Sequence, residues 1–126
     1  MTALTLACSR SIRISEAKRR FGLTERAIRF YEERGLIEVD RDMHNQRCFD
    51  EAAQRRLHWI SSLRAANLPL RDIQYILEVE DKNGLGSQVA ADRLRHQRGE
   101  LLSQLNALDA VAATFESKSA TTHAAA

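Results

Sequence analysis

Residues 22–36, with the sequence GLTERAIRFYEERGL, carry the clearest local signal for the fold of this chain. Thr24 is placed to cap a helix that starts at Glu25, runs to about Arg34 and stops at Gly35. Apolar side chains recur in this helix at helical spacing, which leaves its other face polar. The apolar set is Ala27, Ile28 and Tyr31, and the outward set is Arg26, Arg29 and Glu33. The pattern predicts a short amphipathic helix with a charged outer face.

A shorter helix is expected just before this one. We expect Ser15 to cap residues 16–21, because a serine hydroxyl can accept a hydrogen bond from the first turn of a helix. Gly22 then ends the helix, since a left-handed conformation costs glycine little. A helix, a tight turn that contains glycine and a second helix form a helix-turn-helix.

The chain after the second helix predicts a small β-hairpin. Residues 36–39, with apolar Leu36, Ile37 and Val39, are the first expected strand, and residues 47–49 are the second. Asn45 suits the tip of the hairpin because asparagine tolerates a positive φ. A hairpin in this position is what a winged helix-turn-helix requires.

Two further helices complete the expected DNA-binding domain. Asp50 is placed to cap a helix that ends at Asn67, and we expect Trp59 to reach the edge of the core beside it. Pro69 suits the first turn of the next helix. The apolar face of that helix is Leu70, Ile73, Ile76 and Leu77.

A long amphipathic helix follows, whose apolar positions are spaced in steps of three, four and seven. This spacing is typical of a coiled-coil seam. A helix of this length outside a core cannot bury such a seam alone, so we expect it to pair with the same helix of a second chain. The predicted dimerisation residues are Leu94, Leu101, Leu105, Leu108, Ala112 and Phe115, with Arg98 between the first two.

The expected fold class is therefore mainly α, a winged helix-turn-helix domain followed by a long coiled-coil dimerisation helix. Five parts are predicted in chain order. They are a flexible leader at residues 1–10, the winged helix-turn-helix at 11–80, a linker at 81–86, the dimerisation helix at 87–116 and a disordered tail at 117–126.

Charge and composition narrow the classes of function. Residues 1–66 carry a net charge of +4 and residues 67–126 a net charge of −2, which indicates that the N-terminal half faces a polyanion. No apolar run approaches the roughly 20 residues of a membrane span and no signal peptide is recognisable, so we expect a cytoplasmic protein. The sequence has no phosphate-binding loop, paired carboxylates or nucleophile triad, so we do not expect an enzyme.

The stretch at residues 22–36 closely resembles the recognition-helix signature of the MerR family of transcriptional regulators. NQRCFD (residues 45–50) resembles the wing of that family, and ANLPLRDIQYIL (residues 66–77) resembles its fourth helix. The likeness covers roughly residues 12–115. It implies a homodimer of the short form, without a C-terminal effector domain, that binds an inverted-repeat operator and distorts promoter DNA. The implied partners are double-stranded DNA, a second copy of the chain and, at the promoter, RNA polymerase.

The resemblance and the expected geometry assign the residues that contact DNA. Arg29 and Tyr31 are assigned by the resemblance, whereas Arg26 is our first candidate for reading base edges because it lies on the first turn of the recognition helix. The full predicted set is Thr24, Arg26, Arg29, Tyr31, Arg41, Arg47, Lys18 and Arg19. For five of these a second interpretation stays open: Thr24 as a cap alone, the Tyr31 ring as part of the core, and Lys18, Arg19 and Arg29 on a solvated face.

Cys48 stands in the expected wing, between Arg47 and Phe49. Its thiol is either a sensor of oxidants or a small apolar group on a strand. Metal-responsive members of the family place thiols at the start of the dimerisation helix, whereas this chain has Gly86 and Ser87 there. We therefore expect no soft-metal site and no cofactor.

Two questions about function stay open. The runner-up to a transcription regulator is an architectural DNA-bending protein, or an excisionase-like accessory protein, that bends DNA and regulates no promoter. DNA binding is either independent of any ligand, or controlled by a small molecule in a groove between the long helix and the DNA-binding half.

Overall fold

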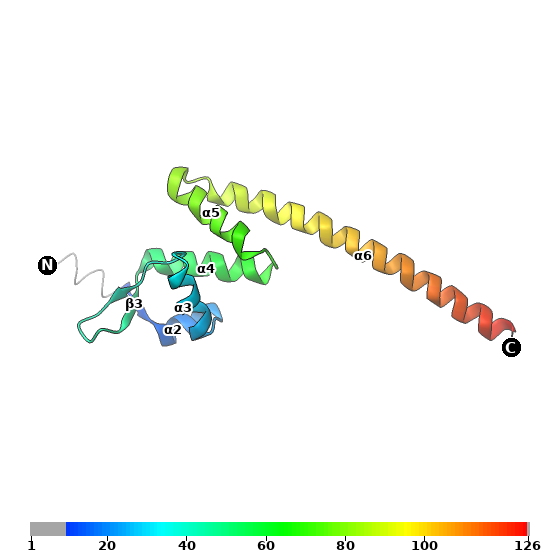
Figure 1. The fold of residues 1–126 in the computed structure, drawn as a ribbon, viewed down its shortest axis with the longest axis horizontal. Coiled ribbons are helices and arrows are strands. Elements are labelled where there is room, and N and C mark those ends of the chain that lie inside the picture. The colour runs from blue at the N-terminus through cyan, green and yellow to red at the C-terminus, as the bar shows by residue number, and fades with distance from the viewer. Residues whose placement is uncertain (1–9, 126) are drawn as a thin grey trace.

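The computed structural model describes the backbone of residues 10–125 and the side chains of residues 10–120. A compact head contains the N-terminal elements, and one long helix projects far beyond it (Figure 1). The elements are β1 (Ile12–Arg13), α2 (Ile14–Phe21), α3 (Glu25–Glu33), β2 (Asp40–Arg41), β3 (Arg47–Phe49), α4 (Glu51–Ala65), α5 (Leu70–Asn83) and α6 (Gly86–Ala125). No helix in this described part is both long and apolar enough to cross a membrane. The expected class, a mainly α winged helix-turn-helix followed by a long helix, is confirmed.

The helix-turn-helix consists of α2 and α3. Gly22 ends α2 with φ 64°, and the Thr24 hydroxyl accepts a hydrogen bond from the Ala27 N–H at 3.1 Å, so both predicted helix boundaries are confirmed. The predicted cap at Ser15 is wrong, because α2 already begins at Ile14. Its N-cap position is Arg13, whose backbone belongs to β1, so the chain enters the helix directly from the sheet.

The wing is a three-stranded antiparallel sheet with the order β1-β3-β2. Asn45 lies at its tip with φ 61°, as predicted, and β3 covers the expected residues. The first strand of the hairpin is β2 and not residues 36–39, because Leu36 and Ile37 are buried in the core and only the polar residues after them pair with β3. Strand β1 was not expected from the sequence.

The core lies where α2, α3, α4 and α5 meet the sheet. The largest fully buried side chains are Phe49, Ile28, Leu57, Ile60, Leu68, Ile73, Ile76 and Leu77. Asp50 caps α4 by accepting a hydrogen bond from the Ala53 N–H at 2.8 Å, and Asn67 ends the turn after it with φ 66°. Trp59 is half-buried against this core, as predicted.

The long helix differs from the expected boundaries at both ends. Helix α5 continues to Asn83 and α6 begins at Gly86, so residues 84 and 85 alone join them, and the predicted linker at 81–86 is too long. Helix α6 continues through Ala125, which makes the expected tail helical at residues 117–125. The segment contains no glycine or proline and several alanines, the best helix formers, so no residue in it stops the helix.

Candidate nucleic-acid interface

The outward face of α3 carries two exposed arginines, Arg26 and Arg29. Arg29 Nη2 lies 2.7 Å from Glu25 Oε1, in an exposed pair one helical turn apart. Such pairs contribute only about 0.3–0.5 kcal/mol, so Arg29 can exchange its carboxylate for a phosphate at little cost. Arg26 has no hydrogen-bonded or ionic partner among the residues that the structure describes. Both arginine side chains are therefore available to contact a polyanion.

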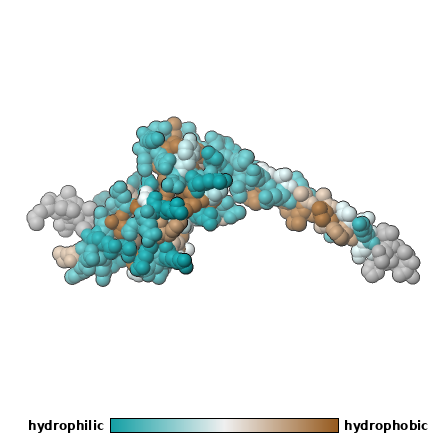
Figure 2. Space-filling view, in the orientation of Figure 1, coloured by the Kyte–Doolittle hydropathy of each residue, from teal (hydrophilic) through white to brown (hydrophobic). Residues whose placement is uncertain are grey.

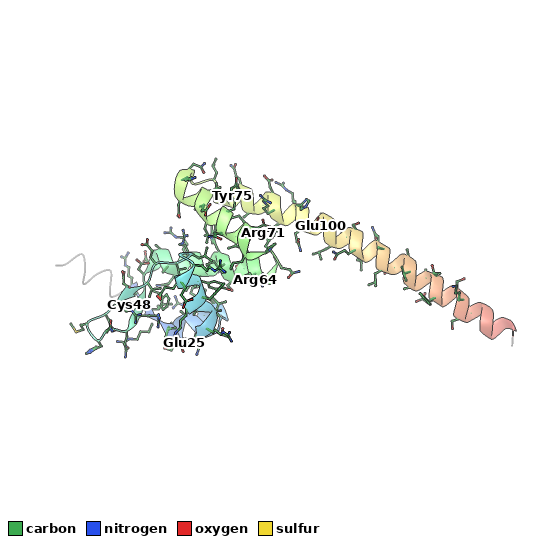
Figure 3. All side chains as sticks on the ribbon, in the orientation of Figure 1. Glu25, Cys48, Arg64, Arg71, Tyr75 and Glu100 are labelled. Carbon is green, nitrogen blue, oxygen red and sulfur yellow. The ribbon has the colours of Figure 1, made fainter. Side chains whose placement is uncertain are left out.

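Arg26 lines a shallow hollow of about 410 Å³ on the N-terminal part of α3. The other lining residues are Thr24, Ala27, Phe30, Tyr31, Arg64 and Leu70. Arg64, near the C-terminal end of α4 (Figure 3), adds a second exposed guanidinium and donates a hydrogen bond to the Leu68 carbonyl at 2.9 Å. Sequence reasoning missed Arg64 because only the packing of α4 against α3 brings it beside the recognition helix.

Thr24 and Tyr31 have structural roles at this hollow. The Thr24 hydroxyl is the N-cap of α3, and the Tyr31 ring is buried with 7% of the residue exposed. Tyr31 also meets the Phe30 ring edge-on, with 6.1 Å between the ring centroids. Thr24 thus caps α3 and the Tyr31 ring belongs to the core, while a contact of either residue with DNA stays a prediction.

The two wing arginines make different contacts. Arg41 Nη1 donates to the Asn45 carbonyl at 3.1 Å across the tip, and Arg41 remains exposed. Arg47 is half-buried and lies between β3 and α3, with its Nε 3.2 Å from Glu32 Oε1. Arg47 therefore ties the wing to the recognition helix, whereas Arg41 projects from the wing.

The turn of the wing is organised by Asp42, which sequence reasoning did not single out. Its Oδ1 accepts hydrogen bonds from the backbone N–H groups of His44 at 2.8 Å and Gln46 at 2.9 Å. Its Oδ2 lies 3.2 Å from Arg13 Nη2. The Gln46 N–H above all holds the pKa of Asp42 below its ordinary value, against the opposing effect of burial. An aspartate two residues before a backbone donor is typical of an Asx turn, which was the available signal.

On α2 the basic residues are not equivalent. Arg19 pairs with Glu16, and Arg20 reaches Glu16 and the Gln54 amide oxygen, each at 3.2 Å. The hydrogen bond from Arg19 is the main cause that lowers the pKa of Glu16, and the same bond raises the pKa of Arg19. Lys18 is exposed and has no ionic partner within the described residues, so it is the most available cation of this helix.

Two expectations concern the Cys48 thiol and metal binding. Cys48 lies half-buried on β3, opposite Asp40 on β2 (Figure 3), and both interpretations of its thiol, oxidant sensor and small apolar group, stay open. Within residues 10–120 no group of three or more His, Cys, Asp or Glu side chains is placed to hold a metal ion.

The fold and the cationic face of α3 define the class of winged helix-turn-helix DNA-binding proteins. The family described as "MerR HTH family regulatory protein" matches residues 12–80, and the one described as "MerR, DNA binding" matches residues 54–117. The chain belongs to the MerR family of transcriptional regulators, and the predicted family is confirmed.

Solved structures agree with this assignment. A MerR family transcriptional regulator from Listeria monocytogenes is 25% identical and aligns over 86% of this chain and 83% of its own, with a TM-score of 0.61. The lead(II) complex of the transcription regulator PbrR691 from Ralstonia metallidurans is 30% identical over 78% of this chain and 79% of its own, with a TM-score of 0.57. HiNmlR, a MerR family regulator lacking the sensor domain and bound to promoter DNA, is 21% identical over 79% and 76%, with a TM-score of 0.62, which shows the shared fold.

Proposed function

We propose that this MerR family regulator acts as a homodimer that binds an inverted-repeat operator and distorts the promoter DNA between its two half-sites. Each protomer places α3 in a major groove, with Arg26 toward the base edges and Arg29, Arg41 and Lys18 toward phosphates. Binding at a promoter brings the dimer beside RNA polymerase. The observation that carries the proposal is an uncovered apolar stripe on α6.

The stripe lies on the part of α6 that projects from the head. Its large apolar residues are between 45% and 65% exposed: Leu101, Leu102, Leu105, Leu108, Val111 and Phe115. Figure 2 shows hydrophobic residues gathered along the outer part of this helix. Removing apolar surface from water contributes about 25 cal/mol per Å², so a second helix laid along this stripe is favourable.

The stripe continues toward the head as a groove of about 370 Å³. The groove is lined by Ala66 at the end of α4 and by α6 residues that include Leu94, Leu101 and Leu105. Leu94 also packs against the core of its own head, so it divides its surface between the head and the groove. One alternative drawn from the sequence is that a small molecule binds in a groove of this kind and controls DNA binding. Because stripe and groove are continuous, we propose that a second copy of the chain covers both.

The proposed binding to DNA is supported by the exposed cations of α3 and by one relative whose structure contains promoter DNA. HiNmlR is described as lacking the sensor domain and as bound to promoter DNA, and we propose the same mode of action for this chain. Distorting 20–30 base pairs costs on the order of 1–6 kcal/mol, which protein contacts to two half-sites must supply.

The test is footprinting followed by transcription from the protected promoter with purified RNA polymerase. The proposal predicts a protected site between the promoter elements and a change in transcript level when the protein is added. Protection and bending without any change in transcript level would contradict it and would instead support the architectural alternative.

A further inference from the structure

The junction between α5 and α6 is so tight that only glycine fits at the first position of α6. Gly86 is buried there. A Cβ atom on Gly86 would lie 2.7 Å from the Glu80 Cβ and 2.9 Å from the Ile76 carbonyl oxygen. Both of these atoms are fixed to the backbone of α5, so a change of rotamer cannot make room. Any larger residue must therefore push the two helices apart.

The link between α5 and α6 is too short for the two helices to separate without a change in the angle between them. Residues 84 and 85 are the whole link, and Gly84 adopts a left-handed conformation with φ 74°. The Gly86 N–H donates to Glu80 Oε1 at 3.2 Å, and the Leu85 N–H donates to Asn83 Oδ1 at 3.0 Å. Side chains at the end of α5 thus accept hydrogen bonds from the backbone of the link and of the first residue of α6.

A second contact fixes the direction of α6 about two turns further along. Arg93 Nη1 lies 3.6 Å from Asp72 Oδ1, and the Arg93 guanidinium stands 5.5 Å from the centroid of the Tyr75 ring. Asp72 and Tyr75 belong to α5 (Tyr75 is labelled in Figure 3), so this clasp and the Gly86 contact join α6 to α5 at two separate points. Together, the Gly86 contact and the Arg93 clasp limit the angle between α6 and the head.

The length of α6 magnifies a small change at the junction. Separating the two carbon atoms from 2.7 Å to a contact distance of about 3.5 Å, with the Arg93 clasp as pivot, tilts α6 by roughly 4–5°. At a rise of 1.5 Å per residue, Leu108 lies roughly 20 Å beyond that clasp and moves by about 2 Å. In a dimer joined through α6, both heads tilt relative to α6, so two such displacements contribute to the change in the distance between the heads.

We propose that Gly86 is a positioning residue that sets the angle between head and α6, and through this angle the distance between the two DNA-reading heads. The inference rests on the homodimer proposed above and adds to it a residue that determines which half-site spacing is read. DNA presents its major grooves at fixed intervals, so heads that are displaced must deform the duplex further in order to bind.

The test measures the distance between the two wings in the free dimer. Met43 at the wing is 93% exposed, so Met43→Cys in a Cys8→Ser, Cys48→Ser background gives one spin-label site per protomer. Gly86→Ala is compared with Gly99→Ala, the same change on the same helix at a position where a Cβ meets no atom within 4 Å. Sedimentation and circular dichroism establish that each variant is a folded dimer.

We expect Gly86→Ala to shift the mean label-to-label distance by about 3 Å or more, and Gly99→Ala to leave it unchanged. On an inverted repeat with the preferred spacer, Gly86→Ala should bind about tenfold more weakly, with the optimum moved to another spacer. The same distance in both variants would overturn the inference while leaving the dimer intact. A parent protein that shows no distance between protomers would overturn the dimer itself.

If Gly86→Ala fails to fold, Arg93→Ala tests the same junction by removing the clasp to Asp72 and Tyr75. The expected result is a shifted or broadened distance distribution in a folded dimer. A distribution identical to that of the parent would contradict control of the head by this junction.

Discussion

The side chains of Arg26 and Arg29 have different partners before the DNA contact that we propose for them. Arg29 pairs with the Glu25 carboxylate at 2.7 Å, whereas the Arg26 side chain has no ionic partner among the described residues. Arg26 also stands on the first turn of α3, directly after the Thr24 cap, where helix-turn-helix proteins read base edges. At the scale of single residues, Arg26 is therefore expected to determine sequence preference and Arg29 to add affinity.

Arg26→Ala should weaken binding to the preferred operator by about 1–3 kcal/mol per half-site and leave binding to random DNA nearly unchanged. The measurement is a competition titration with specific and random duplexes at one salt concentration. Arg95→Ala is the matched control, because it removes the same charge from α6, outside the head. An equal loss of affinity for both duplexes would show that Arg26 contacts phosphate only.

Asp42 makes the stability of the wing depend on pH. Its pKa in the folded protein lies below the ordinary value of 3.8, so its carboxylate stabilises the fold above that pH and this contribution is lost as the pH falls further. Asp42→Asn should therefore unfold at a lower temperature than the parent at pH 7, and the difference should shrink steadily below about pH 4. Thermal melts across this range measure it. A difference that stays constant with pH would contradict the assigned role.

The role of a single residue can be predicted from the sequence when it depends only on residues nearby in the chain. Thr24 and Asp50 each cap the helix that follows them, and Asn45 occupies the turn that its tolerance of positive φ suggests. The contact of Arg47 with DNA stays a prediction, and the structure adds an ion pair with Glu32 on another element. Contacts of this kind depend on how elements pack, so no pattern within one segment reveals them.

At the scale of elements, we propose that the apolar stripe of α6 forms the dimer interface. Leu105→Asp places a charge within the stripe and should shift the protein to monomers at micromolar concentration, since an unpaired charge is costly in an apolar contact. Ser103→Asp adds the same charge on the opposite face of the same turn and should leave the dimer unchanged. Sedimentation equilibrium distinguishes the two. Dimers of equal strength in both variants would place the interface elsewhere.

Elements with a strong periodic pattern could be predicted, and those that depend on distant pairing could not. The apolar faces of α3 and α5 carry a helical period, and the apolar residues of α6 follow steps of three, four and seven in the sequence. Strand β1 has only two residues and exists because Ile12 pairs with Phe49, far along the chain. The end of α6 was missed because alanine, serine and threonine were read as disorder, although none of them is a strong helix breaker.

At the scale of the whole molecule, a dimer presents two copies of the exposed cations Lys18, Arg26, Arg29 and Arg41. If these eight groups meet phosphates or bases, operator affinity should fall by about 10³–10⁵ between 50 and 200 mM salt. Fluorescence anisotropy across this range gives the slope. A loss of less than tenfold would mean that most of these cations face solvent in the complex.

Selection of bound DNA from a pool of randomised duplexes with residues 1–126 measures whether two linked heads read one operator. Two linked heads should enrich an inverted repeat whose half-site centres are separated by one helical turn of DNA, about 34 Å, or by a multiple of it. Enrichment of isolated half-sites with no second copy at a fixed spacing, or no enrichment at all, would contradict the account.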